Sequence, residues 1–205
     1  MKRVLILGGG FAGLAAARRF SRLKNDRMSV AMVNRHQWNV FWLLRPDLIS
    51  GRVSPLHIAY PLEPFCRRHD VEFIQAEVKA ISPLQNKIET ASRPIEADYF
   101  LLCLGGETDY HGSSNIEAHA PGLKSLQEAV TIRRMVRTVV EERKSSSADK
   151  CGHIIIVGGG YTGFETASHI IHLLRSATRC SFQELRDIVT VEIVEKAPKG
   201  LSNTS

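Results

Sequence analysis

The stretch VLILGGGFAGLA at residues 4–15 returns in nearly the same form as IIIVGGGYTGFE at residues 154–165. Each copy places an apolar run before a G-x-G-x-x-G pattern, formed by Gly8, Gly10 and Gly13 and again by Gly158, Gly160 and Gly163. In such a pattern the first glycine permits a tight turn, the second lets the backbone approach a pyrophosphate, and the third lets the helix pack on the strand. We therefore predict two dinucleotide-binding turns in one chain.

The segments around each glycine turn predict the same order of elements, namely strand, helix and strand. The predicted elements are 3–8, 11–24 and 29–33 in the first copy, and 153–158, 161–175 and 189–195 in the second. The strands are short apolar runs, which favours a parallel sheet with both faces buried. The fold class is therefore α/β, with an internal repeat at the scale of a domain.

The region between the two copies is less regular. Residues 38–56 are irregular and aromatic, 57–69 predict a helix, and 71–82 predict a strand. Short strands are expected around KIET and RPIEA, and 98–106 (DYFLLCLGG) predicts a buried strand that glycines terminate.

Residues 125–143 predict a long helix that Ser125 and Glu128 cap as a capping box. Its apolar face consists of Ala129, Ile132, Val136, Val139 and Val140, and the opposite face carries Arg133, Arg134 and Arg137. Either a packed helix with a solvated basic face or a membrane-binding helix has this pattern. The interspersed Glu141 and Glu142 favour the packed helix.

The composition is that of an ordinary globular protein with a moderate basic excess. The 205 residues carry a formal charge of +6, which suits phosphate-bearing ligands or an anionic membrane and is also common on solvated surfaces. We expect no nucleic-acid partner. No apolar run is long enough for a membrane-spanning helix. The N-terminus is not a signal peptide, because glycines and Arg18 and Arg19 interrupt its apolar stretch.

Cysteine and histidine spacing gives no metal motif. Cys66, Cys103, Cys151 and Cys180 form no CxxC pair, and His169 and His172 share a helix face without acidic or cysteine partners. We therefore expect no metal site and a packing or surface role for both histidines.

The end of the second strand of each repeat distinguishes the two copies. A dinucleotide site usually has an acid there that binds the ribose hydroxyls. Glu195 occupies this position in the second copy and predicts NAD rather than NADP, because a carboxylate repels a 2′-phosphate; Lys196 and Lys199 weaken that preference. The first copy has Asn34, followed by Arg35, and both are candidate nucleotide contacts. Alternatively, Asn34 merely ends the strand.

Two G-x-G-x-x-G units separated by DYFLLCLGGETDYHG resemble the flavoproteins with two dinucleotide-binding domains. Among these the sequence is most similar to the type II NADH dehydrogenases, through GGGFAGL, SGRVSP, NIEAHAPGLKSLQEAVTIRRMV, GGGYTGFE and VEIVEKAPKGL. The resemblance implies a Rossmann-like FAD-binding unit followed by an incomplete second Rossmann-like NADH-binding unit. The expected divisions are an FAD domain at 1–124, a connecting helix and Ser-rich linker at 125–150, and the start of an NADH domain at 151–205.

The resemblance also implies roles for individual residues. FAD would be bound by Gly8, Gly10, Phe11, Ala12 and Gly13, with Gly105 at the strand end that faces the flavin. NADH would be bound by Gly158, Gly160, Gly163 and Glu195. Glu165 would lie near the junction of flavin and nicotinamide, or would simply stabilise its helix through the helix dipole.

The implied activity is an NADH-dependent flavin oxidoreductase that passes electrons to a quinone-like acceptor. The disulfide-reductase branch of this fold uses a CxxxxC that is absent here. Two alternatives stay open: a truncated or degenerate FAD/NAD-binding fragment without turnover, and a relative of sulfide:quinone reductases that uses Cys151 or Cys180. We expect a cytoplasmic location, with contact to the inner face of a membrane only through segments beyond these 205 residues.

Overall fold

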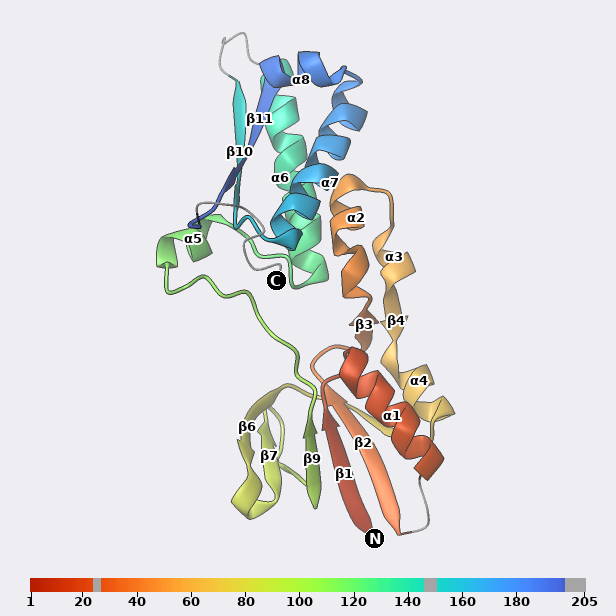
Figure 1. The fold of residues 1–205 in the computed structure, drawn as a ribbon. Helices are drawn as coiled ribbons and strands as arrows, with labels where there is room; N and C mark the ends of the chain where they lie inside the picture. The colour runs from red at the N-terminus through yellow and green to blue at the C-terminus, as the bar shows by residue number, and fades with distance from the viewer. Residues whose placement is uncertain (24–26, 146–150, 198–205) are drawn as a thin grey trace. The chain divides into compact units, whose positions relative to one another are not determined.

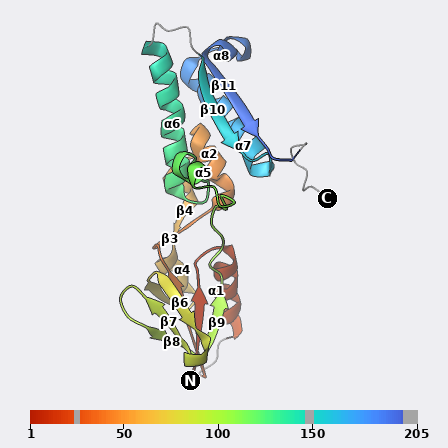
Figure 2. The same ribbon diagram turned by 90° about the vertical axis from the view of Figure 1, so that its left-hand side faces the viewer.

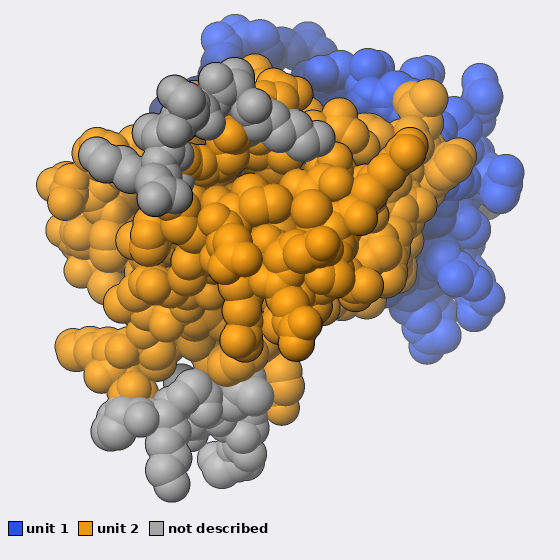
Figure 3. Space-filling model, turned by 90° about the horizontal axis from the view of Figure 1, so that it is seen from above, with its two compact units in different colours: residues 1–40, 59–107 blue, residues 41–58, 108–205 orange. Residues whose placement is uncertain are grey.

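The computed structural model describes residues 1–23, 27–145 and 151–197. The chain divides into two compact units, which Figure 3 colours separately. Unit 1 comprises residues 1–40 and 59–107, and unit 2 comprises residues 41–58 and 108–205. This division by contacts differs from the expected boundary at residue 124, because residues 41–58 group with the later part of the chain. Most of the expected Ser-rich linker lies outside the described residues.

Unit 1 is built on a parallel sheet of four strands in the order β5-β2-β1-β9 (Figure 1). The strands are β1 (Lys2–Leu7), β2 (Met28–Asn34), β5 (Glu72–Gln75) and β9 (Tyr99–Leu102), and helix α1 (Phe11–Leu23) connects β1 to β2. The predicted strand, helix and strand of the first copy are therefore confirmed. β1 and β2 lie at the centre of the sheet, and their apolar residues are almost completely buried.

Two apolar layers cover the two faces of the central strands β1 and β2. The predicted burial of the strand within 98–106 was wrong, because β9 is an edge strand with Tyr99 57% and Leu102 62% exposed. On one face Val4 and Ile6 pack with Ala17 of α1 and with residues of α4 (Leu62–Arg68). On the other face Leu5 and Leu7 pack with Ile88 and Ile95. These last two residues belong to an antiparallel sheet of β6 (Val78–Ser82), β7 (Lys87–Thr90) and β8 (Ile95–Glu96), which Figure 2 shows in front of β1 and β9.

The segment between β2 and β5 differs from the prediction. In place of one helix over 57–69, the chain forms α3 (Pro55–Ile58), β4 (Ala59–Pro61) and α4. Pro61 is the reason, because proline disfavours helical geometry in the residue before it and itself adopts an extended conformation here. The predicted strand over 71–82 is two strands, β5 and β6. The aromatic stretch is also more regular than expected: it contains β3 (Trp38–Val40), η1 (Trp42–Leu44) and α2 (Arg45–Ser50).

Unit 2 repeats the strand, helix and strand around a smaller sheet. β10 (Gly152–Val157) pairs in parallel with β11 (Val189–Val194), and α7 (Tyr161–Thr178) connects them, as predicted. A short helix, α8 (Phe182–Ile188), precedes β11 and was not predicted, although Ser181 and Glu184 form a complete capping box at its start. Unit 2 also contains α5 (Ser114–His119) and α6 (Leu126–Ser145).

Helix α6 has the predicted cap and the predicted apolar face. The Ser125 backbone N–H donates to the Glu128 carboxylate at 2.5 Å, and the Glu128 N–H donates to the Ser125 hydroxyl at 3.1 Å. Ala129, Val136 and Val140 are buried. The expectation that all three arginines lie on a solvated face was wrong for one of them. Arg133 is half-buried, and a Cβ built on Gly51 would lie 2.7 Å from its guanidinium.

Helix α2 packs against both α6 and α7 within unit 2. The His169 Nδ1 lies 3.0 Å from the Ser50 hydroxyl, and the His172 Nδ1 lies 3.4 Å from the Arg52 guanidinium. Both histidines are partly buried and contact the end of α2 or the residues after it, in agreement with the predicted packing or surface role.

Candidate functional site: two glycine turns

The first glycine turn begins where β1 ends. Gly8 has φ of +110°, a conformation that L side chains rarely adopt, and its N–H donates to the Val33 carbonyl of β2 at 2.8 Å. A Cβ on Gly8 would collide with the Cys103 carbonyl oxygen, and a Cβ on Gly13 would collide with the Gly8 carbonyl oxygen. The turn therefore accepts only glycine at these two positions, which is the physical basis of the first and third glycines of the motif.

The second glycine turn repeats this geometry in unit 2. Gly158 has φ of +107°, and its N–H donates to the Val194 carbonyl of β11 at 2.8 Å. A Cβ on Gly163 would collide with the Gly158 carbonyl oxygen, as in the first turn. The two copies of the sequence motif thus form the same strand–turn–helix structure.

The middle glycine of each motif faces open space. A Cβ built on Gly10 or on Gly160 would meet no atom within 4 Å. Each glycine immediately precedes a helix, α1 at Phe11 and α7 at Tyr161. The first backbone N–H groups of a helix have no acceptor within the helix, and the helix dipole favours an anion at this end. The space and the donors fit a pyrophosphate at both turns.

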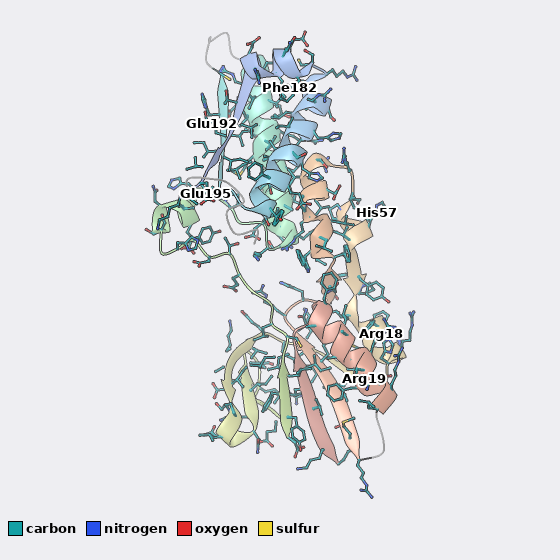
Figure 4. All side chains as sticks on the ribbon, viewed as in Figure 1. Arg18, Arg19, His57, Phe182, Glu192 and Glu195 are labelled. Carbon is teal, nitrogen blue, oxygen red and sulfur yellow. The ribbon has the colours of Figure 1, made fainter. Side chains whose placement is uncertain are left out.

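The residue at the end of the second strand holds each turn through a hydrogen bond. In unit 1 the Gly9 N–H donates to the Asn34 amide oxygen at 2.8 Å, and in unit 2 the Gly159 N–H donates to the Glu195 carboxylate at 2.6 Å. Figure 4 labels Glu195 at the end of β11. The two strand-end residues, Asn34 and Glu195, therefore have the same structural contact despite their different charge.

The surroundings of the two strand-end residues are different. The Asn34 amide also donates to the His36 carbonyl at 2.6 Å, and the Asn39 amide donates to the Gly9 carbonyl at 2.7 Å. Glu195 accepts a second hydrogen bond from the Ala197 N–H at 2.9 Å. The backbone N–H groups of Ala197 and Gly159 lower the pKa of Glu195 from its ordinary value. This residue is therefore a carboxylate at neutral pH.

The remaining predicted residues lie at or near the ends of the strands and at the starts of the helices of the two turns. Phe11 and Ala12 are exposed at the start of α1, and Gly105 follows β9 with φ of +76° and open space around it. The Arg35 guanidinium donates to the His36 ring at 3.1 Å. Glu165 is exposed on α7.

Sequence reasoning missed three residues of these turns. Gly9 and Gly159 are buried donors to the strand-end residues, and Asn39 binds the Gly9 carbonyl. The signal for the two glycines was present, because both motifs read GGG rather than GxG. A Cβ on Gly9 would lie 2.6 Å from Leu62, and one on Gly159 would lie 3.0 Å from Glu195.

Metal ligands, membrane-spanning helices and paired cysteines are further features that would mark a functional site. Among the described residues, no group of three or more His, Cys, Asp or Glu side chains is arranged to hold a metal ion. No helix in the described part of the chain combines the length and apolar character needed to cross a membrane. All four cysteines are free thiols.

Comparison with known proteins identifies the family. Residues 2–204 match the family described as pyridine nucleotide-disulphide oxidoreductase. The chain belongs to this family. Curated relatives include the type II NADH:quinone oxidoreductases of Staphylococcus haemolyticus, 26% identical over 204 residues, and Staphylococcus aureus, 25% identical over 207 residues. Both alignments cover 98% of this chain, which spans about half (50%) of each relative.

Solved structures support the fold of this family member. NDH2 from Plasmodium falciparum in complex with NADH matches with a TM-score of 0.86 at 18% identity, over 100% of this chain and 44% of that one. The sulfide:quinone oxidoreductase from Aquifex aeolicus matches with a TM-score of 0.76 at 20% identity, over 97% and 44%. The predicted resemblance to type II NADH dehydrogenases and the α/β, Rossmann-like fold class are thereby confirmed.

Proposed function

We propose that unit 1 binds FAD at its glycine turn, that unit 2 binds NADH at its own, and that the protein passes electrons from NADH through flavin to a quinone. The observation that carries the proposal is the pair of matched turns, each with open space at its middle glycine and a helix beginning directly behind it. The names of the curated relatives support NADH and quinone as the two substrates.

In this proposal the chain mainly binds and orients the two nucleotides. The N–H groups at the starts of α1 and α7 hold the two pyrophosphates, and Gly10 and Gly160 allow the backbone to approach them. Phe11, Ala12, Asn34 and Arg35 contact the first nucleotide. FAD, when bound, supplies the hydride acceptor for the nicotinamide. Gly105 supports it from the end of β9, and Glu165 orients the nicotinamide.

Glu195 makes NADH a better ligand than NADPH in this proposal. Its pKa is lowered, so at neutral pH it carries a negative charge toward the adenosine ribose. A carboxylate accepts hydrogen bonds from the ribose hydroxyls and repels a 2′-phosphate. The exposed Lys196 follows Glu195 and carries the opposite charge. The preference for NADH over NADPH therefore requires the Glu195 carboxylate to lie closer to the ribose than the Lys196 ammonium does.

The acceptor and the location are proposed from the relatives. A quinone takes two electrons and two protons, so NADH, one further proton and quinone give NAD⁺ and quinol. Membrane contact would come from segments outside these 205 residues, at the inner face of the membrane, and the rest of the protein would lie in the cytoplasm. The thiols of Cys151 and Cys180 are not paired with each other, so no observation favours sulfide chemistry.

The test is purification of the 205-residue chain, reconstitution with FAD, gel filtration, and then titration with NADH. We expect flavin absorbance to stay with the protein and NADH to bind, with weak or no quinone turnover, because the chain spans half of its relatives. The absence of bound flavin after reconstitution would contradict the proposed FAD site. Rapid turnover by the chain alone would instead show that these residues suffice for the whole reaction.

A further inference from the structure

Asn39 contacts the first glycine turn, although it lies 30 residues further along the chain. Its side-chain amide donates to the Gly9 carbonyl at 2.7 Å. The N–H of the same glycine donates to the Asn34 amide oxygen at 2.8 Å. Both backbone polar groups of Gly9 are therefore held by side chains.

The position of Asn39 is fixed by the antiparallel pair of β3 and β4, which lies beside the start of α1 (Figure 1). Asn39 is opposite Tyr60 in this pair, and the chain passes from β4 directly into α4. The first residue of α4, Leu62, is fully buried in the core of unit 1. A Cβ on Gly9 would lie 2.6 Å from Leu62, so the turn also packs against the start of α4.

The hydrogen bond from Asn39 determines the direction of the next N–H group along the chain. The peptide between Gly9 and Gly10 is trans, because the described residues contain no cis peptide bond, and a trans N–H points opposite to the carbonyl oxygen. The Gly10 N–H therefore points away from Asn39. It has no acceptor among the described residues, and the Cβ position of Gly10 faces open space. It is an available donor at the start of α1.

The second turn has one of these two contacts. In the described part of unit 2, the Gly159 N–H donates to Glu195, but no side chain donates to the Gly159 carbonyl. Asn39 follows the strand-end residue of unit 1 by five positions, and the fifth residue after Glu195 is Gly200, which has no side-chain donor. The carbonyl of Gly159 is therefore less restricted than that of Gly9.

We propose that Asn39 is a positioning residue for the pyrophosphate site of unit 1. By holding the Gly9 carbonyl, it keeps the Gly10 N–H directed toward the phosphate oxygens before the nucleotide binds. The inference rests on the proposed function, in which the first turn binds the pyrophosphate of FAD. A donor that is already oriented does not have to be ordered on binding, so loss of the Asn39 amide weakens binding at the first turn alone.

The experiment follows the Gly10 and Gly160 amide resonances of the nitrogen-labelled chain during titration with inorganic pyrophosphate and then with FAD. Asn39→Leu removes the donor at similar side-chain size. We expect it to weaken binding of both ligands at Gly10 about fivefold to tenfold, the usual effect of one hydrogen bond. The response of Gly160 to pyrophosphate stays unchanged. Asn39→Asp places an acceptor against the Gly9 carbonyl and weakens binding further.

Gln37→Leu is the matched control. It replaces another side-chain amide of the same segment, which is exposed and has no described partner, and it binds both ligands like the wild type. Circular dichroism and amide exchange in β1 check that every variant folds. These two measurements separate a change in the binding site from a loss of structure.

A Gly10 response in Asn39→Leu equal to that of the wild type would overturn the proposal, and so would an equal weakening at Gly10 and Gly160. A wild-type chain that binds pyrophosphate at Gly10 but not FAD would contradict the FAD site alone, and weaker pyrophosphate binding by Asn39→Leu would then still support the role of Asn39. If neither ligand shifted the wild-type Gly10 resonance, both proposals would be wrong.

Discussion

Two glycine turns in this chain have the same backbone and different surroundings. Gly8 and Gly158 have φ of +110° and +107°, and both donate to the neighbouring strand at 2.8 Å. The first turn lies in a sheet of four strands whose central strands, β1 and β2, are covered on both faces, and the second lies in a pair of strands with one face exposed. The turn geometry is therefore determined by its own short sequence and two strands. The surrounding residues of each unit determine how much a substitution in the turn lowers the free energy of unfolding.

The largest difference is expected for alanine at the first glycine. Both Gly8→Ala and Gly158→Ala force an L side chain into left-handed geometry, at a cost of roughly 1–2 kcal/mol. Only Gly8→Ala also drives a Cβ into the Cys103 carbonyl. We expect it to lower the free energy of unfolding of unit 1 by more than about 3 kcal/mol, and Gly158→Ala to lower that of unit 2 by about 1–2 kcal/mol.

The two tryptophans allow each unit to be followed separately in urea. Trp38 belongs to unit 1 and Trp42 to unit 2, so Trp42→Phe leaves a reporter for unit 1 and Trp38→Phe a reporter for unit 2. If Gly8→Ala and Gly158→Ala lowered the free energy of unfolding of their units equally, the expected difference between the two turns would be contradicted.

A second difference is expected at alkaline pH. Burial raises the pKa of the Cys66 thiol in unit 1 to about 11, from an ordinary value of 9.0. The thiol is protonated in the folded state. Its contribution to the free energy of unfolding is therefore fully present below about pH 9 and is lost as pH rises to about 11. The loss is about 2–3 kcal/mol, at 1.36 kcal/mol per pKa unit. Cys151 and Cys180 of unit 2 are only partly buried.

Urea unfolding at pH 8, 9, 10 and 11 measures this effect with the two tryptophan reporters. We expect unit 1 to lose stability over this range, and a Cys66→Ala variant to lose most of the pH dependence of that stability while starting from a lower value. A smaller slope remains, because burial also raises the pKa of the Cys103 thiol in unit 1. If the same slope persisted in Cys66→Ala, groups other than this thiol would be responsible.

The smallest difference is expected at the two strand-end residues. Glu195 and Asn34 both accept from a turn N–H, but only Glu195 brings a charge. Glu195→Ala should weaken NADH binding about tenfold, because a charged hydrogen bond contributes about 1.5–3 kcal/mol, and Glu195→Gln should recover part of the loss. Asn34→Leu should lower the affinity for FAD about fivefold, and Asn34→Asp should bind FAD with the wild-type affinity or more tightly.

Calorimetric titration of each ligand measures these four variants. Equal affinities for Glu195→Ala and Glu195→Gln would contradict a role for the hydrogen bond to Gly159. An Asn34→Leu variant with unchanged FAD affinity would show that Asn34 merely ends its strand.

The sequence predicted the parts of this fold that depend on local pattern. Apolar runs and fixed glycine spacing predicted β1, α1, β2, β10, α7 and β11, and the spacing of Ser125 and Glu128 predicted the start of α6. Contacts between distant residues were not predictable in this way. The position of Arg133 depends on Gly51, directly after α2, and the pairing of β3 with β4 depends on residues some twenty positions apart. The hydrogen bonds that Gly9 and Gly159 donate join residues 25 and 36 positions apart, and no local sequence pattern predicts them.

The central claim is that the first turn binds FAD and the second binds NADH, and valine at the two middle glycines tests it most directly. Gly10 and Gly160 have open space around them, and neither has positive φ, so Gly10→Val and Gly160→Val should fold normally while blocking the pyrophosphate. The measurement is the affinity of each variant for FAD and for NADH. We predict that Gly10→Val loses FAD affinity about a hundredfold and keeps NADH binding, and that Gly160→Val does the reverse. Loss of the same ligand in both variants, or of neither, would contradict the account.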